Sequence, residues 1–299
     1  MSEDALKILE ALMARLEGAY AHATLRAYRA DFEQFIRYCQ KEAFPLWPSS
    51  PEAVSGFVAH LTGSGLRSAS IRRAVGGIAT LHQLARMKDP TKDPEVRLAM
   101  RRMHRTLGRA ARQAGAIDQE ILEQLIAVTD DSLRGLRNRA ILLVGYDTLC
   151  RRSELTSLQI QDLKPRKILL RHSKTDPDGV GRWLSLSQRA DRALRTWIEA
   201  AELAQGPIFR RLHGQARPLE PLSAGQINRI LKRLARAANL DPASVSGHSM
   251  RIGAAQDLLQ KGASLPDIMH RGRWSKTDTV MRYLESAPVR FEGDAEEED

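Results

Sequence analysis

The stretch Ser246-Gly247-His248-Ser249-Met250-Arg251-Ile252-Gly253-Ala254-Ala255 narrows the fold and the chemistry of this chain most. His248 and Arg251 are three positions apart, so on a helix they share a face and can point at one ligand. The small residues at 253–255 would let that helix pack closely against another. Alone, this spacing is more typical of a surface histidine beside an ordinary helical arginine, so its meaning depends on the rest of the chain.

Further polar residues stand in series around this stretch. Arg151 lies in Leu149-Cys150-Arg151-Arg152-Ser153-Glu154-Leu155, Lys174 lies in Arg171-His172-Ser173-Lys174-Thr175, and Trp274 and Tyr283 come last. Two arginines, a lysine and a histidine that converge on a tyrosine suit the attack of a phenol on a phosphodiester. The transition state carries about two negative charges, which forked guanidinium groups can bridge. The series therefore indicates phosphoryl transfer.

Each member of the series also has an ordinary interpretation. Arg151 or Arg152 could be the exposed end of the apolar helix before it, and spacing alone does not separate the two. Lys174 could protect an edge strand, which is a common use of lysine. Trp274 and Tyr283 could be core residues. Only the whole series, in this order, favours the functional interpretation.

Composition favours a nucleic-acid partner. The chain has 299 residues, enough for two domains, and a formal net charge of +10 with a pI near 9.9. That charge suits a polyanion, although ribosomal association or non-specific binding would also fit it. Cys39 and Cys150 lack metal-ligand spacing, which favours a reducing compartment. No apolar stretch reaches membrane-spanning length, and the acidic start does not resemble a signal peptide. We expect a soluble intracellular protein.

The first part of the chain, residues 1–108, is expected to be almost purely helical. Apolar positions at helical spacing predict a helix over 23–42, which the prolines of 44–48 end. Ser50 then predicts an N-cap before Pro51. Another helix is expected from Ser68 or Ser70, followed by a loop at 89–93 and a helix over 94–107.

Six arginines follow between 97 and 112, before a small-residue connector at 113–116. An isolated charge run is usually a solvated helix face. Here acidic residues are absent after Glu95, so we interpret the run as a basic helix and linker that lie along a phosphate backbone.

From Asp118 onward the pattern predicts a mixed domain. Lys167–Arg171 and Gly181–Leu186 are expected to be two strands flanking a turn-rich tip at 175–179, which places Lys174 on a hairpin. The remaining segments are expected to be helical: 118–128, 134–149, 152–158, 187–203, 223–238, 249–260, 265–271 and 276–285. The predicted fold is mainly α with a small β-hairpin or sheet in the C-terminal domain.

The ordered series resembles the tyrosine recombinase (phage integrase) family and its Arg, Lys, His-x-x-Arg, His/Trp, Tyr pattern. The resemblance covers residues 20–286 and fades in the hairpin tip, in 205–225 and in the tail. It implies a two-domain architecture: a helical core-binding domain (1–108), a basic linker (109–117), a catalytic domain (118–286) and a tail (287–299). In the family the arginine lies three residues before the glutamate, which selects Arg151 over Arg152. Trp274 stands where many members have histidine.

The resemblance also implies roles. Tyr283 would attack a DNA phosphate to give a 3′-phosphotyrosine and a free 5′-hydroxyl, Lys174 would act as general acid, and His248 would move the proton of the nucleophile. Stabilisation of the pentacoordinate state would fall to Arg151, Arg251 and Trp274, with Glu154 holding the basic groups. No cofactor is expected, because the covalent bond keeps the phosphodiester energy and the chain has no Gly-Lys pair for a P-loop. No metal is expected either, since neither a carboxylate cluster nor a His/Cys ligand set is evident.

The expected partner is double-stranded DNA at paired inverted-repeat sites, bound by a homotetramer that is monomeric when free. The site would be read by helices in major grooves. The candidate DNA-binding residues are Arg26, Arg29, Arg72, Arg73, Arg101, Arg102, Arg105, Arg229, Lys232 and Arg233. The resemblance places such a protein in the cytoplasm of a prokaryote or a phage host, associated with the nucleoid.

Two other functions share parts of this pattern. A type IB topoisomerase-like enzyme would use the same chemistry with swivelling in place of strand exchange, and the helical N-terminal domain disfavours it. A catalytically silent DNA-binding protein would keep the fold, and the intact series disfavours that. The biological role stays open between resolving replicon dimers, integrating an element and resolving transposon cointegrates.

Overall fold

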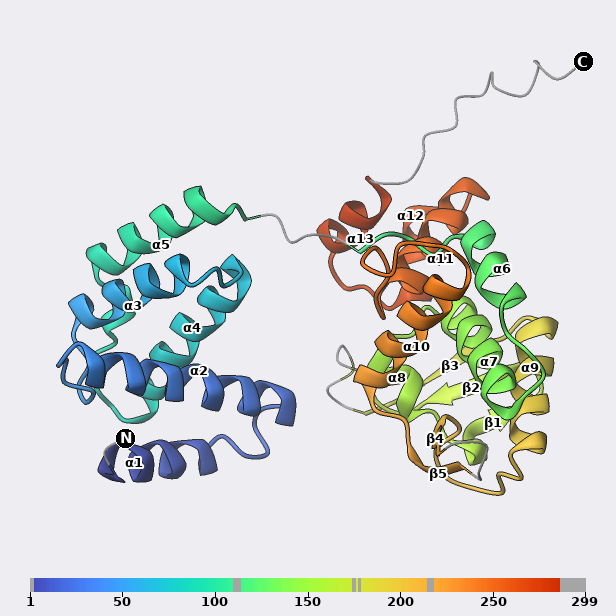
Figure 1. Ribbon diagram of the computed structural model, residues 1–299, viewed down its shortest axis with the longest axis horizontal. Helices are drawn as coiled ribbons and strands as arrows, with labels where there is room; N and C mark the ends of the chain where they lie inside the picture. The colour runs from blue at the N-terminus through green and yellow to red at the C-terminus, as the bar shows by residue number, and fades with distance from the viewer. Residues whose placement is uncertain (1–2, 110–113, 174–175, 177–178, 214–217, 286–299) are drawn as a thin grey trace, which may run out of the picture. The chain divides into compact units, whose positions relative to one another are not determined.

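The computed structural model describes residues 3–109, 114–173, 176, 179–213 and 218–285 (Figure 1). The chain divides into two compact units, Met1–Arg112 and Gln113–Asp299, and each has a hydrophobic core of its own. The division falls inside the segment 109–117 that the sequence predicts to be a linker. Within the described residues, none of the helices is both long and apolar enough to cross a membrane.

The described part of the N-terminal unit is helical. Its elements are α1 (Glu3–Ala14), α2 (His22–Lys41), α3 (Pro51–Gly63), α4 (Ser68–Leu84), the 3-10 turn η1 (Pro90–Lys92) and α5 (Pro94–Leu107). Ser50 caps α3 by accepting a hydrogen bond from the backbone N–H of Ala53, and Pro51 stands at the first helical turn, as expected. The predicted loop at 89–93 contains the short turn η1.

The described part of the C-terminal unit combines helices with two small sheets. Its helices are α6 (Gln119–Ala127), α7 (Leu133–Thr148), α8 (Arg152–Ser157), the 3-10 turn η2 (Ile160–Asp162), α9 (Gln188–Ala200), α10 (Ala224–Ala237), α11 (Ser249–Gln260), α12 (Leu265–Gly272) and α13 (Thr277–Leu284). One antiparallel sheet has the order β1 (Leu163–Lys164), β2 (Lys167–Leu170), β3 (Arg182–Ser185). The other pairs β4 (Arg210–Leu212) with β5 (Pro218–Pro221).

The predicted hairpin strands are confirmed as β2 and β3, with Leu169 opposite Trp183. The expectation of a mainly α fold with small C-terminal sheets is likewise confirmed. The sequence did not predict β1, β4 or β5. These strands are too short for an alternating pattern, and β5 begins and ends with proline, which is normally depleted in strands.

Helix α11 is held between α7, the entry to α6 and α13. Gly253 meets the chain just before α6 so closely that a Cβ atom there would lie 1.8 Å from the carbonyl oxygen of Ile117. A Cβ atom on Gly145 of α7 would lie 2.7 Å from the side chain of Met250. Farther along α11, the side-chain amide of Gln256 donates to the carbonyl oxygen of Tyr283, on α13, at 2.7 Å. The small residues therefore bring the ends of these helices into one region.

Candidate functional site

The first arginine of the series is placed by a sharp reversal after α7. Leu149 adopts a left-handed conformation (φ 50°, ψ 30°), and Arg151 becomes the N-cap of α8. The Glu154 carboxylate accepts the Arg151 backbone N–H at 2.9 Å and its Nη1 at 2.6 Å. Arg151 is therefore turned inward, whereas Arg152 is exposed.

Glu154 is the centre of a polar network. The side chain is 3% exposed and also accepts from the Ser173 hydroxyl at 2.9 Å and from Arg273 Nη2 at 3.0 Å. Burial alone would raise the pKa of this carboxyl, but the guanidiniums of Arg273 and Arg151 together with the Arg151 backbone N–H bring the pKa below its ordinary value. Glu154 is therefore a carboxylate at neutral pH.

Arg251 lies on α11 and is 2% exposed. Its Nη1 donates to the carbonyl oxygen of Leu149 and its Nη2 to that of Gly272. Burial, followed by the nearby charges of Arg151 and Arg273, lowers the pKa of Arg251 to about 9. The group remains cationic at pH 7, in a place where positive charge is crowded.

Trp274 and Tyr283 continue this cluster toward the surface. The Arg251 guanidinium carbon lies 4.1 Å from the centre of the Trp274 ring, a cation–π contact. The Trp274 and Tyr283 ring centres are 5.9 Å apart. Both aromatic side chains also belong to a small hydrophobic cluster with Val280 and Leu284, so packing and proximity to Arg251 occur together.

His248 is the N-cap of α11 (φ −97°, ψ −15°). The helix predicted over 249–260 is confirmed as α11, and His248 directly precedes it, with its carbonyl oxygen accepting the Ile252 backbone N–H at 3.0 Å. The His248 side chain is exposed. Even so, the surrounding protein partly desolvates the ring and, with the arginines 251, 152 and 151, lowers its pKa. At neutral pH the imidazole is neutral and can accept a proton.

Lys174 falls outside the described residues. Its neighbour Ser173 is described, and the Ser173 hydroxyl donates to Glu154. Strand β2, which leads to this segment, ends at Leu170. The chain entering Lys174 is thus tied to the same carboxylate that holds Arg151.

Two residues of this network were not predicted from the sequence. Ser173 lies beside Lys174, which was the only signal for it. Arg273 stands in Arg271-Gly272-Arg273-Trp274, which resembles an exposed basic stretch, yet Arg273 is 7% exposed. The pairing of Arg273 with Glu154 joins positions far apart in sequence, so no local pattern could have revealed it.

Tyr146 is the other tyrosine near the cluster. Its hydroxyl donates to the Asp257 carboxylate. Burial and then this hydrogen bond raise the pKa of the Tyr146 phenol. A phenol so engaged is a poor nucleophile, which leaves Tyr283 as the better placed of the two.

The candidate DNA-binding residues differ in their surroundings. Arg73 makes a two-point ion pair with Asp31, at 2.7 and 3.0 Å, and Arg29 pairs with Glu10. A phosphate would have to compete with these carboxylates. Exposed side chains make up the remainder of the group: Arg26, Arg72, Arg101, Arg102, Arg105, Arg229, Lys232 and Arg233. On α10 the opposite face is buried, from Ile227 to Ala235, as the periodicity predicts.

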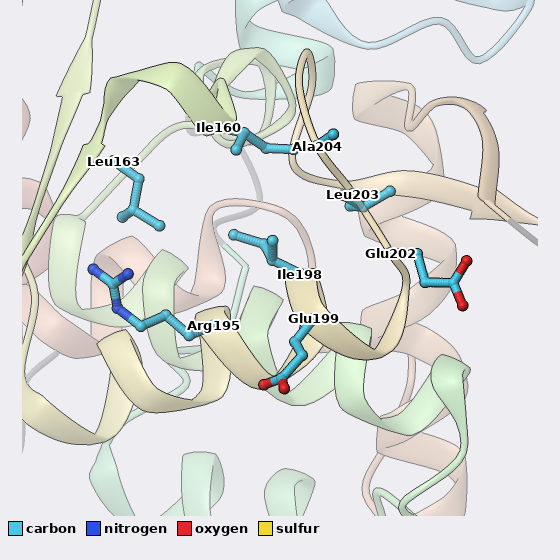
Figure 2. A pocket seen from close by; sticks show the side chains of 8 residues that line it. All are labelled: Ile160, Leu163, Arg195, Ile198, Glu199, Glu202, Leu203 and Ala204. Atoms are coloured by element: carbon cyan, nitrogen blue, oxygen red, sulfur yellow. The ribbon is translucent and has the colours of Figure 1, made fainter.

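A cavity of about 470 Å³ lies elsewhere in the C-terminal unit, between η2, β1 and the end of α9 (Figure 2). Ile160, Leu163 and Ile198 face it, while the carboxylates of Glu199 and Glu202 point outward. None of the candidate catalytic residues lines it. Within the described part of the chain, no group of three or more His, Cys, Asp or Glu side chains could hold a metal ion.

Comparison with known proteins identifies relatives along nearly the whole chain. Residues 116–290 match the family model described as phage integrase family, and residues 10–88 match the phage integrase N-terminal SAM-like domain. An integrase/recombinase xerD homolog of Selenomonas ruminantium is 31% identical over 290 residues, which cover 92% of this chain and 85% of the homolog. Recombinase cre of Escherichia phage P1 is 27% identical over 296 residues, covering 91% and 86%.

Solved structures agree on the fold. A lambda integrase dimer bound to a COC′ core site matches with a TM-score of 0.70 at 16% identity, covering 95% of this chain and 79% of the integrase. From the sequence, segments 22–113, 246–255 and 280–283, together with Trp274, predict a resemblance that is greatest to Cre. Because the identity to the xerD homolog is higher, the resemblance extends across the family and is not specific to Cre.

Proposed function

Since this chain belongs to the phage integrase family and is a site-specific tyrosine recombinase that acts on DNA, we propose that Tyr283 is its nucleophile. The Tyr283 oxygen forms a bond to the scissile phosphorus, and the bond from phosphorus to the 5′ oxygen breaks. The products are a 3′-phosphotyrosine and a free 5′-hydroxyl. Rejoining reverses these steps with a 5′-hydroxyl from another strand, so no nucleotide cofactor is consumed.

The observation that carries this proposal is the charge balance around Glu154 and Arg251. The cluster holds the guanidiniums of Arg151, Arg251 and Arg273 and one carboxylate, that of Glu154. Its formal charge is therefore +2. Burial lowers the pKa of Arg251 most, and the charges of Arg151 and Arg273, which belong to this excess, lower that pKa further. A transition state with about two negative charges is the ligand that such a site favours, because fixed cations act on charge as it develops.

We assign the remaining roles as the family resemblance implies them. Arg151 and Arg251 donate hydrogen bonds to the non-bridging phosphate oxygens, and Trp274 donates its indole N–H to one of these oxygens. His248, neutral at pH 7, accepts the phenolic proton as Tyr283 attacks. Lys174 gives a proton to the departing 5′ oxygen, and Glu154 holds Arg151 in place.

At the level of assembly, we propose that the N-terminal unit and the C-terminal unit act as core-binding and catalytic domains on each half of an inverted repeat. Four protomers would then act on two paired sites. The lambda integrase relative forms a dimer on a core site, and XerH binds a palindromic difH substrate, arrangements consistent with this proposal.

Trp274 in place of histidine is the trait shared with Cre-type members. We place the protein at the nucleoid of a prokaryotic or phage-infected cell.

Tyr283→Phe tests the proposal. The variant should bind its site with nearly unchanged affinity and form no covalent DNA adduct, because only the hydroxyl is removed. The substrate is a nicked suicide duplex built on inverted repeats found beside the gene, and the readout is a denaturing gel. Tyr146→Phe is the matched control and should still form the adduct. An adduct from the Tyr283 variant that disappears in the Tyr146 variant would reverse the assignment.

A further inference from the structure

Arg273 occupies an unusual place between α12 and Trp274. Its backbone is left-handed (φ 58°, ψ 46°), a conformation that non-glycine residues adopt rarely. The side chain is 7% exposed. A large cationic residue in a buried position with glycine-like backbone geometry incurs both strain and desolvation, so its contacts are the place to look for its role.

Those contacts join three elements of the site. Arg273 Nη2 donates to Glu154 Oε2 at 3.0 Å and to the Leu149 carbonyl oxygen at 3.2 Å, and Nη1 donates to the Thr148 carbonyl oxygen at 3.0 Å. Both side chains of the Arg273–Glu154 ion pair are 4% exposed. The guanidinium of Arg273 thus binds the end of α7 and the start of α8, and Arg273 itself directly precedes Trp274.

We propose that Arg273 is a positioning residue for phosphoryl transfer. It rests on the proposed function and acts through Glu154. One oxygen of that carboxylate is held by Arg273 and by the Arg151 backbone, while the other holds Arg151 Nη1 and Ser173. Through this carboxylate Arg273 fixes the orientation of the Arg151 side chain and the position of the chain that leads to Lys174.

Arg273 also keeps Glu154 ionised. Its charge is the largest of the influences that lower the pKa of Glu154 against the effect of burial. Without Arg273, burial would raise that pKa, and a protonated Glu154 would lose part of its hold on Arg151. Arg273 is 7% exposed and pairs with Glu154, so its effect should be indirect and should depend on Glu154.

Three variants test this inference in the full chain on the suicide duplex. Arg273→Gly removes the side chain and suits the left-handed backbone, and Arg273→Lys keeps the charge and the strained backbone without the fork. Arg271→Ala is the control, because Arg271 is exposed, two residues away and bonded only weakly to the Asp147 carbonyl oxygen at 3.3 Å. Single-turnover cleavage should fall about 100-fold for Gly, since small misplacements cost on that order. Lys should recover part of the loss, and site affinity should change less than about threefold in every variant.

Two further readouts separate positioning from mere structure. In a Glu154→Gln background, Arg273→Gly should cost far less than in the wild type, because the residue acts through Glu154. The cleavage rate of Arg273→Gly should also increase with pH across a range in which the wild-type rate is flat, since its Glu154 pKa is raised. If Arg273→Gly does not fold, Arg273→Lys is compared in the wild-type and Glu154→Gln backgrounds in its place.

The outcomes are distinguishable. The inference would be overturned if Arg273→Gly cleaved at the wild-type rate, or if it lowered the cleavage rate equally with Glu154 and with Gln at position 154. The proposed function would stand in either case. A wild-type protein that forms no adduct on its own site would instead overturn the proposed function. A loss in Arg273→Gly that is partly restored by Lys and is absent in Arg271→Ala supports the inference.

Discussion

Glu154→Gln offers a quantitative test of the network. The change keeps the shape of the side chain and removes its charge, which leaves the buried Arg273 without its carboxylate. Removing one partner of a buried ion pair costs about 3–5 kcal/mol. At about 3 kcal/mol, a catalytic unit of this size should lose roughly 6–12 °C in Tm, because each kcal/mol is worth about 2–4 °C.

Calorimetry on the full chain suits this test, since the two units have separate cores and can show separate transitions. The transition of the C-terminal unit should move, and that of the N-terminal unit should not. Glu123→Gln is the matched control: its pair with Arg189 has side chains that are 46% and 52% exposed. An exposed pair contributes about 0–1 kcal/mol. A Glu154 variant that shifts Tm no more than the Glu123 variant would refute the buried-network interpretation.

The pH dependence of the same difference has a definite sign. The pKa of Glu154 is lowered in the folded state, so its stabilising contribution is present above the ordinary carboxyl pKa, about 4.3. The contribution is lost as the pH falls through the lower folded value. The stability difference between wild type and Glu154→Gln should therefore be full at pH 7 and shrink below about pH 4. A difference that grew on acidification would contradict the assignment of Glu154 as the ionised partner.

Two further predictions concern segments outside the described residues. Lys174→Ala should slow cleavage strongly on ordinary DNA and much less on DNA with a 5′-bridging phosphorothiolate, because sulfur leaves without a proton; equal rate defects on the two substrates would remove Lys174 from the role of general acid. Truncation after Glu285 should preserve single-site binding and impair synapsis and recombination, because a head-to-tail ring needs an element passed to the neighbour and Val289 and Phe291 are the larger apolar residues there. Sedimentation with paired full sites measures this, and an intact tetramer of the truncated protein would count against it.

The helices could be predicted well because their signals are local. Pro94 and the capping residue Asp93 begin α5 where the sequence indicates, and Ser50 does the same for α3. The sheet β4–β5 could not be predicted, since short strands with terminal prolines depend on their pairing and not on propensity.

The site was predictable only in part. Local motifs could be identified in the sequence, whereas contacts between residues far apart in the sequence could not. The members of the series were identified as an ordered set, and the structure brings Arg151, Arg251, Trp274 and Tyr283 together. Ion pairs across tertiary structure left no local trace. The sequence did not predict the ion pairs of Arg29 with Glu10 and of Arg73 with Asp31, and the DNA contacts expected for these two arginines stay a prediction.

The choice between Arg151 and Arg152 shows how local structure and chemistry coincide at this site. Spacing left both arginines possible, but a helix that begins at Arg152 leaves the Arg151 backbone N–H in need of an acceptor. Glu154, three residues later, supplies one oxygen to that N–H and the other to the Arg151 guanidinium. The hydrogen bonds that start α8 are therefore the ones that turn Arg151 inward. Because Arg273 binds the same carboxylate, one buried ion pair joins the end of α12 to the start of α8, and Trp274 is the residue that follows Arg273.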